Sequence, residues 1–406
     1  MDDIRYVILG GGVTAGYAAR KFVEAGGQTD ELCIVCAEDR LPYDRPPLSK
    51  DVLKGERDVE DAAINERDFY SDNGIEVLLD CAVTGVDLEE RTLTTSTGDT
   101  IGFEKLLIAT GTKPRRLDIP GSNRDGLLYL RSAADANRIV TAARRGDKAV
   151  VLGGSFIGTE VGASLTERGV DVTLVSRSEH LLQGMPLTPK MAGYFERCFE
   201  RRGVNLVLGD EATSLEDDGS ALEVILASGA THQADFVIAG IGVSPATELF
   251  SNSELETSDG ILVNEYLETR VDGVYAAGDI ARYWDSLFET TRRIEHWDNA
   301  RSGGEHCALA MLGERRPYLH VPYFFSDVFD LSWEFWGDHS TANQVVYRGA
   351  VEDGSFSTWW LNGSMVVGAF VINRPNDERE LAQELIRSGR TVSAEDLETA
   401  AALPTE

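Results

Sequence analysis

The chain is poor in basic residues and has no long hydrophobic run, and each scarcity excludes a class of protein. Its 38 Lys and Arg residues stand against 68 Asp and Glu, which gives a net charge of −30 at pH 7. Such a field repels nucleic acid and anionic membranes, so we expect neither as a partner. No apolar stretch approaches the roughly 20 residues of a membrane span, and no signal-like run precedes the first apolar segment. We therefore expect a globular cytoplasmic protein of two or three domains.

Lysine is especially rare, with 7 lysines against 31 arginines. An acidic, lysine-poor surface is typical of proteins that stay hydrated at high salt. A biased genome composition explains the same counts equally well. The sequence leaves both origins open.

Five cysteines, an odd number scattered along the chain, indicate reduced thiols rather than a disulfide framework. Cys33 and Cys36 form a C-x-x-C, but they lie in 32–36, an apolar run typical of a buried parallel strand. Residues three apart on a strand point to opposite faces, so we predict core positions and no redox pair. The six histidines are too scattered to suggest a metal site, and we expect no metal.

A glycine motif lies between the first predicted strand and the first predicted helix. Gly10 permits a tight turn, Gly12 lets the backbone approach a pyrophosphate at the helix N-terminus, and Ala15 takes the last position of G-x-G-x-x-G/A. Glu38 lies 22 residues beyond Gly16, after the second predicted strand. This is close to the spacing at which a carboxylate accepts ribose hydroxyl groups. The order of elements predicts a first dinucleotide fold.

The pattern recurs at Gly153, Ser155 and Gly158, again between a predicted strand and a predicted helix. Ser155 replaces the middle glycine, which makes the backbone approach tighter without excluding it. The following strand ends in 176–178 (Ser-Arg-Ser) instead of an acid, which weakens selection for the 2′-hydroxyl of NADH. Arg177 is suited to the 2′-phosphate of NADPH, although a solvated loop arginine is an equal alternative. We predict a second dinucleotide fold with either nicotinamide nucleotide as its ligand.

Two distant segments complete the first fold. Residues 106–111 form an apolar run that ends at Thr110 and Gly111, small residues of the kind needed where backbone abuts a cofactor. Residues 274–279 form a second apolar run, which ends at Asp279. This carboxylate is suited to accept hydrogen bonds from polyol hydroxyl groups, and alone it would equally suit a helix cap.

With these residues in place, the whole chain resembles the flavoprotein pyridine-nucleotide oxidoreductases. The resemblance implies that the first fold holds FAD, that the second holds NAD(P)H, and that Asp279 contacts the ribityl chain. Disulfide reductases of this superfamily carry a redox C-x4-C after the first fold, where residues 42–50 here (PYDRPPLSK) contain no cysteine. That segment resembles the branch of ferredoxin reductases, apoptosis-inducing-factor-like proteins and monodehydroascorbate reductases.

The branch implies roles for charged residues that periodicity alone does not assign. Arg45 would contact FAD, Lys50 would pair with Glu160 beside the flavin ring, and Arg131 would meet the FAD pyrophosphate. Lys50 and Glu160 as solvated charges are the alternative.

Aromatic residues match the branch as well. Trp297, in 295–297 (EHW), would lie at the flavin and open a helix, with a plain core residue as the alternative. Phe156 would lie at the nicotinamide side. Segments 321–326 and 329–338 are similar to monodehydroascorbate reductase in particular.

The acceptor pocket departs from the plant monodehydroascorbate reductases. Arg301 fits an arginine of their ascorbate pocket, but Phe325 and Asp327 stand where the plant enzymes have tyrosine and arginine. An anion in place of a cation should weaken binding of an anionic ascorbyl species. The resemblance is therefore stronger for the fold than for the substrate.

Together these features predict an α/β protein with two Rossmann-like domains of the three-layer ββα type and a C-terminal α+β interface domain. The expected domains are 1–114 and 245–309 for FAD, 115–244 for NAD(P)H, and 310–406 for the interface. We expect an enzyme that transfers hydride from NAD(P)H to FAD and then electrons to an acceptor. That acceptor is a ferredoxin- or rubredoxin-type protein, or a monodehydroascorbate-like or quinone-like small molecule. The alternative is a redox-sensing conformational switch like apoptosis-inducing factor, although the basic surface of that factor is missing here. A monomer and a homodimer are both compatible with the sequence.

Overall fold

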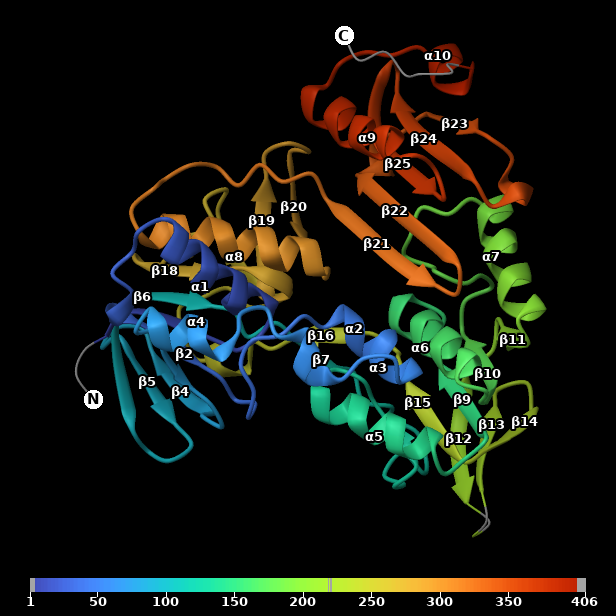
Figure 1. Cartoon of the computed structure of the whole chain (residues 1–406), viewed down its shortest axis with the longest axis horizontal. Coiled ribbons are helices and arrows are strands. Elements are labelled where there is room, and N and C mark those ends of the chain that lie inside the picture. Colours follow the sequence, from blue (N-terminus) through green and yellow to red (C-terminus); the bar gives the residue numbers. More distant parts are fainter. Residues whose placement is uncertain (1–3, 218, 220, 400–406) are drawn as a thin grey trace. The chain divides into compact units, whose positions relative to one another are not determined.

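The computed structural model describes residues 4–217, 219 and 221–399 (Figure 1). The chain divides into two units, which we describe separately. Unit 1 comprises Met1–Arg45, Glu60–Lys113 and Ser244–Pro322, and unit 2 comprises Pro46–Val59, Pro114–Val243 and Tyr323–Glu406. The chain passes between them in β7 (Thr112–Pro114), in β16 (Val243–Pro245), at η2 (Val59–Ala62), and at residues 45–46 and 322–323. The finer division into four segments remains our proposal.

Unit 1 is built on a sheet with the strand order β3-β2-β1-β6-β5-β4, in which β18 also pairs with β6. Its parallel part is β1 (Ile4–Leu9), β2 (Leu32–Val35), β3 (Glu76–Leu78), β18 (Val274–Ala276) and the end of β6 (Thr100–Ile108). The start of β6 pairs antiparallel with β5 (Thr92–Thr95), which pairs with β4 (Val83–Asp87). All four residues of β2 are buried, as expected for a parallel strand covered on both faces.

Helices α1 (Val13–Glu24) and α8 (Trp297–Met311) pack together in unit 1. Their backbones approach closely because a Cβ at Gly304 would lie only 2.4 Å from the carbonyl oxygen of Thr14. The remaining elements of unit 1 are α4 (Arg67–Asp72), η1 (Thr29–Glu31), η3 (Glu248–Phe250), η4 (Gly278–Ile280), and a small sheet of β17 (Ile261–Val263), β19 (Ala281–Asp285) and β20 (Thr290–Arg293).

Unit 2 contains a second parallel sheet, in the order β11-β10-β9-β15-β8. Its strands are β8 (Leu127–Leu128), β9 (Lys148–Leu152), β10 (Asp171–Ser176), β11 (Asn205–Leu208) and β15 (Phe236–Ala239). An antiparallel sheet accompanies it, formed by β12 (Ala212–Asp217), β13 (Leu222–Leu226) and β14 (Thr231–Ala234). The helices of this part are α2 (Pro46–Ser49), α3 (Asp51–Lys54), α5 (Ala133–Ala143), α6 (Phe156–Glu167) and α7 (Pro189–Arg201).

Side-chain caps fix the starts of two of these helices. Ser132 and Asp135 form a reciprocal capping box at α5. Thr188 caps α7, where Pro189 takes the first helical position.

The C-terminal part of unit 2 is an antiparallel sheet in the order β21-β22-β25-β24-β23. Its strands are β21 (Tyr323–Val328), β22 (Leu331–Gly337), β23 (Gln344–Arg348), β24 (Phe356–Asn362) and β25 (Met365–Ile372). Helix α9 (Asn376–Ser388) contacts β22 and β25, and η5 (His339–Thr341), η6 (Val351–Asp353) and α10 (Ala394–Thr399) complete it.

The predicted fold class is confirmed, with two parallel-sheet folds, each extended by antiparallel strands, and a C-terminal α+β region. Among the described residues, no helix has the length and apolarity needed to cross a membrane.

Candidate functional site

The first glycine turn of unit 1 leaves the start of α1 open to a ligand. Gly10 has φ 126°, and a Cβ there would lie 2.3 Å from the carbonyl oxygen of Ala109, so only glycine fits. A Cβ at Gly12 would meet just one described atom within 4 Å, Nη2 of Arg45 at 3.9 Å. Gly12 is the N-cap of α1 and supplies no side-chain cap, while Ala15 is fully buried beneath. Uncapped N–H groups beside an arginine suit a pyrophosphate.

Glu38 and Arg45 face each other beside this turn. Arg45 Nη2 donates to Glu38 Oε1 at 2.9 Å, and the Tyr43 hydroxyl donates to Oε2 at 2.7 Å. Burial lowers the pKa of Arg45, but Tyr43, Glu38 and Asp279 outweigh it and hold that pKa above its ordinary value. The Arg45 guanidinium therefore stays positively charged in a partly buried site, where it faces the carboxylate of Glu38.

Asp279 lies in η4, directly after β18. Its Oδ2 accepts a hydrogen bond from the Thr112 hydroxyl at 3.1 Å, and its backbone carbonyl accepts one from Arg293 Nη1 at 3.1 Å. The hydroxyl of Thr110 donates to the carbonyl oxygen of Ala246, and Gly111 has φ 63°. The Asp279 carboxylate is thus held in place. After β6, the chain turns at Gly111 through a left-handed conformation that favours glycine.

Trp297 begins α8 in unit 1. Its Nε1 donates to Asp44 Oδ1 at 2.6 Å, and its ring meets Tyr17 edge-on at 5.8 Å. The Arg301 guanidinium lies 5.7 Å from the Trp297 ring centre and pairs with Glu305 at 3.1 Å. The indole is only half-buried, packed on one side against a small apolar cluster.

The second glycine turn, in unit 2, repeats the geometry of the first. Gly153 has φ 118°, and a Cβ at Gly158 would lie 1.8 Å from the carbonyl oxygen of Gly153. Ser155 is the N-cap of α6, is exposed, and makes no side-chain capping bond. The start of α6 is therefore open despite the serine.

Arg177 follows the last residue of β10 and is exposed, while Ser176 is buried. A Cβ at Gly154 would lie 2.7 Å from Ser176 Oγ, so this serine occupies the space under the turn. Arg131 lies just before α5, where its backbone N–H donates to Asp135 Oδ2 at 3.1 Å.

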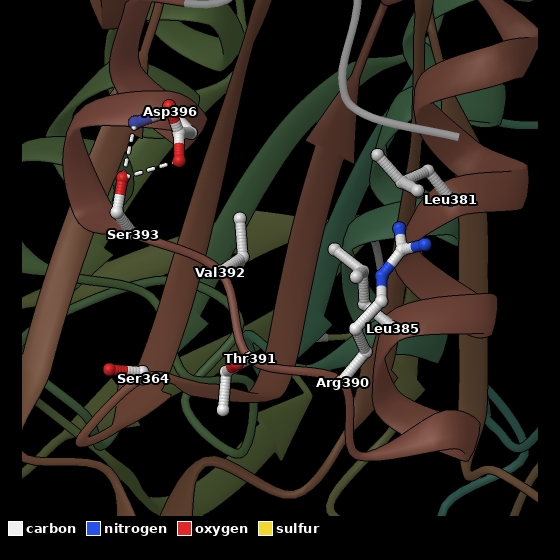
Figure 2. A pocket seen from close by; sticks show the side chains of 8 residues that line it. All are labelled: Ser364, Leu381, Leu385, Arg390, Thr391, Val392, Ser393 and Asp396. Carbon is white, nitrogen blue, oxygen red and sulfur yellow. Dashed lines mark hydrogen bonds between the residues drawn. The ribbon is translucent and has the colours of Figure 1, made fainter. Parts of the chain in front are cut away.

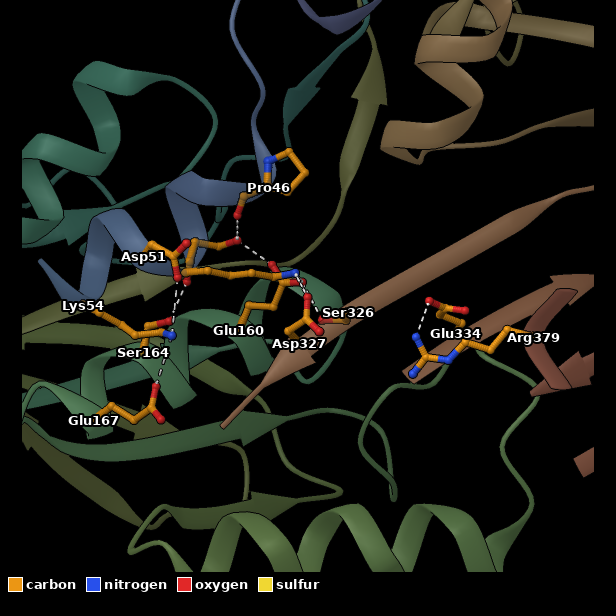
Figure 3. Close-up of polar contacts among 12 residues, drawn as sticks. Pro46, Asp51, Lys54, Glu160, Ser164, Glu167, Ser326, Asp327, Glu334 and Arg379 are labelled. Carbon is orange, nitrogen blue, oxygen red and sulfur yellow. Dashed lines mark hydrogen bonds and ion pairs between the residues drawn. The ribbon is translucent and has the colours of Figure 1, made fainter. Parts of the chain in front are cut away.

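A buried ion pair joins Lys50 to Glu160, which lies in α6 little more than one turn beyond its N-cap (Figure 3). Lys50 Nζ is 3.5 Å from Glu160 Oε1 and 3.5 Å from Asp327 Oδ2. The Ser326 hydroxyl donates to Glu160 Oε1 at 2.6 Å, and the Ser49 hydroxyl donates to Oε2. Both oxygens of Glu160 are occupied as acceptors, and its side chain is only 8% exposed. We call Lys50, Glu160 and Asp327 the lysine cluster.

Aromatic rings lie on the same elements as the lysine cluster in unit 2, and one of them contacts Lys50. Phe156, the first residue of α6, stacks at 6.4 Å with Phe324 and lies 5.3 Å from Trp333. The Lys50 ammonium lies 5.1 Å from the ring centre of Phe325.

The sequence did not reveal several of these partners. Asp327 was noted only as a departure from relatives, and its contact with Lys50 bridges 277 positions. No sequence pattern of its own identifies any of four other partners, which are Ser49, Ser326, Asp44 and Tyr43. The last two lie beside Arg45 in the same short segment, which is the one clue the sequence offers.

Cys33 and Cys36 are confirmed as core residues. Both are buried and free. Burial is the main cause that raises the pKa of each thiol to about 12. A Cβ at Gly11 would lie 2.5 Å from Cys36 Sγ, so this thiol supports the first glycine turn from below. A thiol so shielded is a poor nucleophile.

A separate cavity of about 310 Å³ lies in the C-terminal part of unit 2 (Figure 2). Leu381 and Leu385 of α9 form its apolar wall, and Ser393 donates to Asp396 at 2.6 Å on the opposite side. It contains none of the residues predicted to bind a nucleotide.

Two open glycine turns, each joining a parallel strand to a helix, define a protein that binds two dinucleotides. Residues 4–304 match the family described as pyridine nucleotide-disulphide oxidoreductase, and residues 321–403 match the C-terminal domain described as monodehydroascorbate reductase 3-like. The chain belongs to the pyridine nucleotide-disulphide oxidoreductase family. It is an NAD(P)H-dependent flavoprotein oxidoreductase with FAD as its cofactor, as the sequence predicted.

Curated relatives cover nearly the whole chain. Peroxisomal monodehydroascorbate reductase 4 of Arabidopsis thaliana is 37% identical over 97% of this chain and 84% of its own length. Monodehydroascorbate reductase of Pisum sativum is 34% identical over 96% of this chain and 95% of its own length.

Solved structures give a second group of similar proteins. A ferredoxin reductase from Rhodopseudomonas palustris superposes with a TM-score of 0.93 at 28% identity, covering 98% of each chain. Putidaredoxin reductase, from its covalent complex with putidaredoxin, superposes with a TM-score of 0.91 at 27% identity. The match covers 98% of this chain and 96% of the other.

Proposed function

We propose that this oxidoreductase passes electrons from NAD(P)H to an acceptor without using a cysteine pair. One observation carries the proposal. Residues 42–50, where a disulfide reductase has its redox cysteines, instead supply Arg45 to the first glycine turn and Lys50 to the lysine cluster. The nearby thiols of Cys33 and Cys36 are buried in the core.

The residues at the first glycine turn fit FAD. Gly10, Gly12 and Ala15 would hold the pyrophosphate against α1, and Glu38 would accept the ribose hydroxyl groups. The other proposed FAD contacts are Arg45, Lys50, Thr110, Gly111, Arg131, Asp279 and Trp297. When bound, FAD supplies the step that accepts a hydride and releases electrons to the acceptor.

The second glycine turn fits a nicotinamide nucleotide. Gly153, Ser155 and Gly158 would hold its pyrophosphate at the start of α6, and Phe156 would border the nicotinamide. Arg177 is exposed directly after β10, and the residue that ends this strand, Ser176, is not an acid. We propose that Arg177 binds the 2′-phosphate and favours NADPH.

Lys50, Glu160 and Trp297 are the proposed catalytic residues. Glu160 holds Lys50 in position, and two serine hydroxyls in turn hold Glu160. Lys50 would then be a fixed cation beside the flavin ring. Trp297 is fixed by its hydrogen bond to Asp44 and would border the flavin from the start of α8.

Two classes of acceptor follow from the relatives. The monodehydroascorbate reductases support a small-molecule acceptor, with Arg301 and Phe325 as substrate contacts. The ferredoxin reductase and putidaredoxin reductase support a ferredoxin-type protein. Location in the cytoplasm remains a prediction, since the Arabidopsis relative is named peroxisomal.

Turnover by the purified holoprotein tests this function. NADH and NADPH are each combined with a benzoquinone, monodehydroascorbate, ferricyanide and a ferredoxin. We expect yellow protein with flavin absorbance and multiple turnovers with at least one acceptor. Protein without flavin, or flavin reduced by NAD(P)H that none of the four acceptors reoxidises, would contradict the proposal.

A further inference from the structure

The lysine cluster carries one more negative than positive charge. Lys50 contributes one cation between two carboxylates, each 3.5 Å away. Glu160 is 8% exposed and saturated by two serine hydroxyls, whereas the Asp327 side chain is 54% exposed. Because buried Glu160 neutralises Lys50, the charge of Asp327 remains uncompensated within the cluster and faces solvent.

An aromatic surface lies on the same strand as Asp327. Tyr323, Phe325 and Asp327 alternate along β21 and therefore share one face of the sheet. The rings of Tyr323 and Phe325 stack at 5.8 Å, and Tyr323 stacks at 5.2 Å on Trp336 of the neighbouring strand. We call Tyr323, Phe325 and Asp327 the β21 face.

The field of Asp327 reaches across the sheet. Glu334 is the cross-strand partner of Phe325 and pairs with Arg379 at 3.0 Å (Figure 3). Burial raises the pKa of Glu334, Arg379 and Tyr323 oppose this effect, and the charge of Asp327 adds a smaller contribution that raises the pKa further. Since Glu334 and Arg379 balance each other, they do not offset the charge of Asp327.

Strand β21 also lies along the helix that begins at the second glycine turn, and it contacts that helix through Phe324 and Ser326, which lie on the side of the strand opposite to the β21 face. Phe156 at the start of α6 stacks with Phe324 of β21, and Glu160 of α6 accepts a hydrogen bond from Ser326 of β21. Strand β21 therefore follows α6 from the nicotinamide end to the lysine cluster.

We propose that Asp327 selects the electron acceptor by charge, so that the β21 face takes an uncharged aromatic acceptor of the quinone type in preference to an anion. This rests on the proposed function, which puts Lys50 and Glu160 at the reaction centre. A planar quinone stacks on Phe325 with no repulsion from Asp327. An anion that approaches to about 4 Å of that carboxylate in water loses a factor of about five in affinity, and more where water is excluded.

The overall reaction balances without a further reactant. NAD(P)H gives up a hydride, which is two electrons and one proton, and water supplies the second proton. The quinone accepts both electrons and both protons, so that NAD(P)H, H⁺ and quinone become NAD(P)⁺ and hydroquinone. Product and substrate are both uncharged, and Asp327 repels neither.

Acceptors of different charge separate this role from a structural one. We would measure kcat/KM of the holoprotein with a neutral benzoquinone, anionic ferricyanide and cationic hexaammineruthenium(III). In D327N we expect kcat/KM to rise at least about fivefold for ferricyanide, which carries three negative charges, and to fall for hexaammineruthenium, while kcat/KM for the neutral quinone changes less than that for either ion. The rise should shrink in molar KCl, which screens the charge. D327S gives a second neutral variant.

A matched control removes the same charge elsewhere. Asp353 is an exposed carboxylate in η6 of the same unit, and D353N should leave the ratio of ferricyanide to hexaammineruthenium unchanged. Equal shifts for both ions in D327N and D327S, or no shift in either variant, would overturn the proposal. So would a wild-type kcat/KM for monodehydroascorbate at or above that for the benzoquinone. A wild-type protein that reduces none of the acceptors would instead overturn the proposed function.

Discussion

At Gly158 a single methyl group is enough to disturb the second nucleotide turn. Its Cβ would lie 1.8 Å from the carbonyl oxygen of Gly153, so G158A must displace the turn that opens α6. Strain of this kind costs about 1–3 kcal/mol, and we expect the KM for NAD(P)H to rise roughly tenfold or more. The absorbance of bound flavin per protein should not change, because the first glycine turn is the proposed FAD site.

Gly162 on the same helix provides the control. A Cβ there would meet Leu174 Cδ1 at 3.4 Å, which is ordinary contact. G162A should keep the KM of the wild type, since alanine also favours the helix. Equal KM values for the two variants would contradict the assignment of the second turn to the nicotinamide nucleotide.

In the proposed function, Arg177 favours NADPH as the hydride donor. A charge-assisted hydrogen bond to a phosphate contributes about 1.5–3 kcal/mol, so R177A should raise the KM for NADPH about tenfold or more and leave that for NADH unchanged. Steady-state kinetics with both nucleotides checks this. R145A, at an exposed arginine after α5, should affect neither. Parallel changes for both nucleotides would show that Arg177 is a solvated loop residue.

At the scale of elements, helix α8 contains a buried histidine with a pH-dependent effect on stability. Burial is the largest cause that lowers the pKa of His306 to about 4, and its ring lies 5.2 Å from that of Tyr318. The unfolded chain takes up a proton near the ordinary value of about 6.5, while the folded chain resists it. This contribution to stability is therefore complete above pH 6.5 and is lost as the pH falls toward 4.

Urea unfolding at pH 7 and pH 5 measures this effect. The wild type should lose about 2 kcal/mol of unfolding free energy from His306 over this interval, a loss that H306Q should not show. H339Q, at an exposed histidine, should behave like the wild type. The same pH dependence in H306Q and wild type would contradict this account.

The sequence predicted the elements that local patterns define. Alternating residues in 357–360 and 365–368 are typical of strands, and the pattern of 376–388 is typical of a helix. These segments lie in β24, β25 and α9 (Asn376–Ser388). The glycine turns were expected because a tight turn between strand and helix requires residues such as Gly10 and Gly153.

Contacts between distant segments were not predicted. The sequence marked Asp327 as unusual, yet its pairing with Lys50 depends on how β21 runs beside α6. Ser49 and Ser326 hold Glu160 only because α2 and β21 both reach that carboxylate. Side-chain partners of this kind follow from tertiary packing, which periodicity does not encode.

For the whole molecule, the net charge of −30 predicts a dependence on salt. Mutual repulsion of the carboxylates destabilises the folded chain, and added ions screen it. We expect the free energy of unfolding to rise from dilute buffer to about 0.15 M KCl. A further rise in molar KCl would favour adaptation to high salt, and a plateau would favour a compositional origin. Stability that falls or stays constant on adding salt would contradict the prediction.

In the proposed function, electrons pass through the flavin alone, with no redox-active thiols. Anaerobic titration of the purified holoprotein with dithionite tests it directly by counting the electrons taken up per bound flavin. The burial of Cys33 and Cys36 and the absence of cysteine from residues 42–50 predict two electrons per flavin. An uptake of four electrons per flavin would reveal a second redox group and contradict the account.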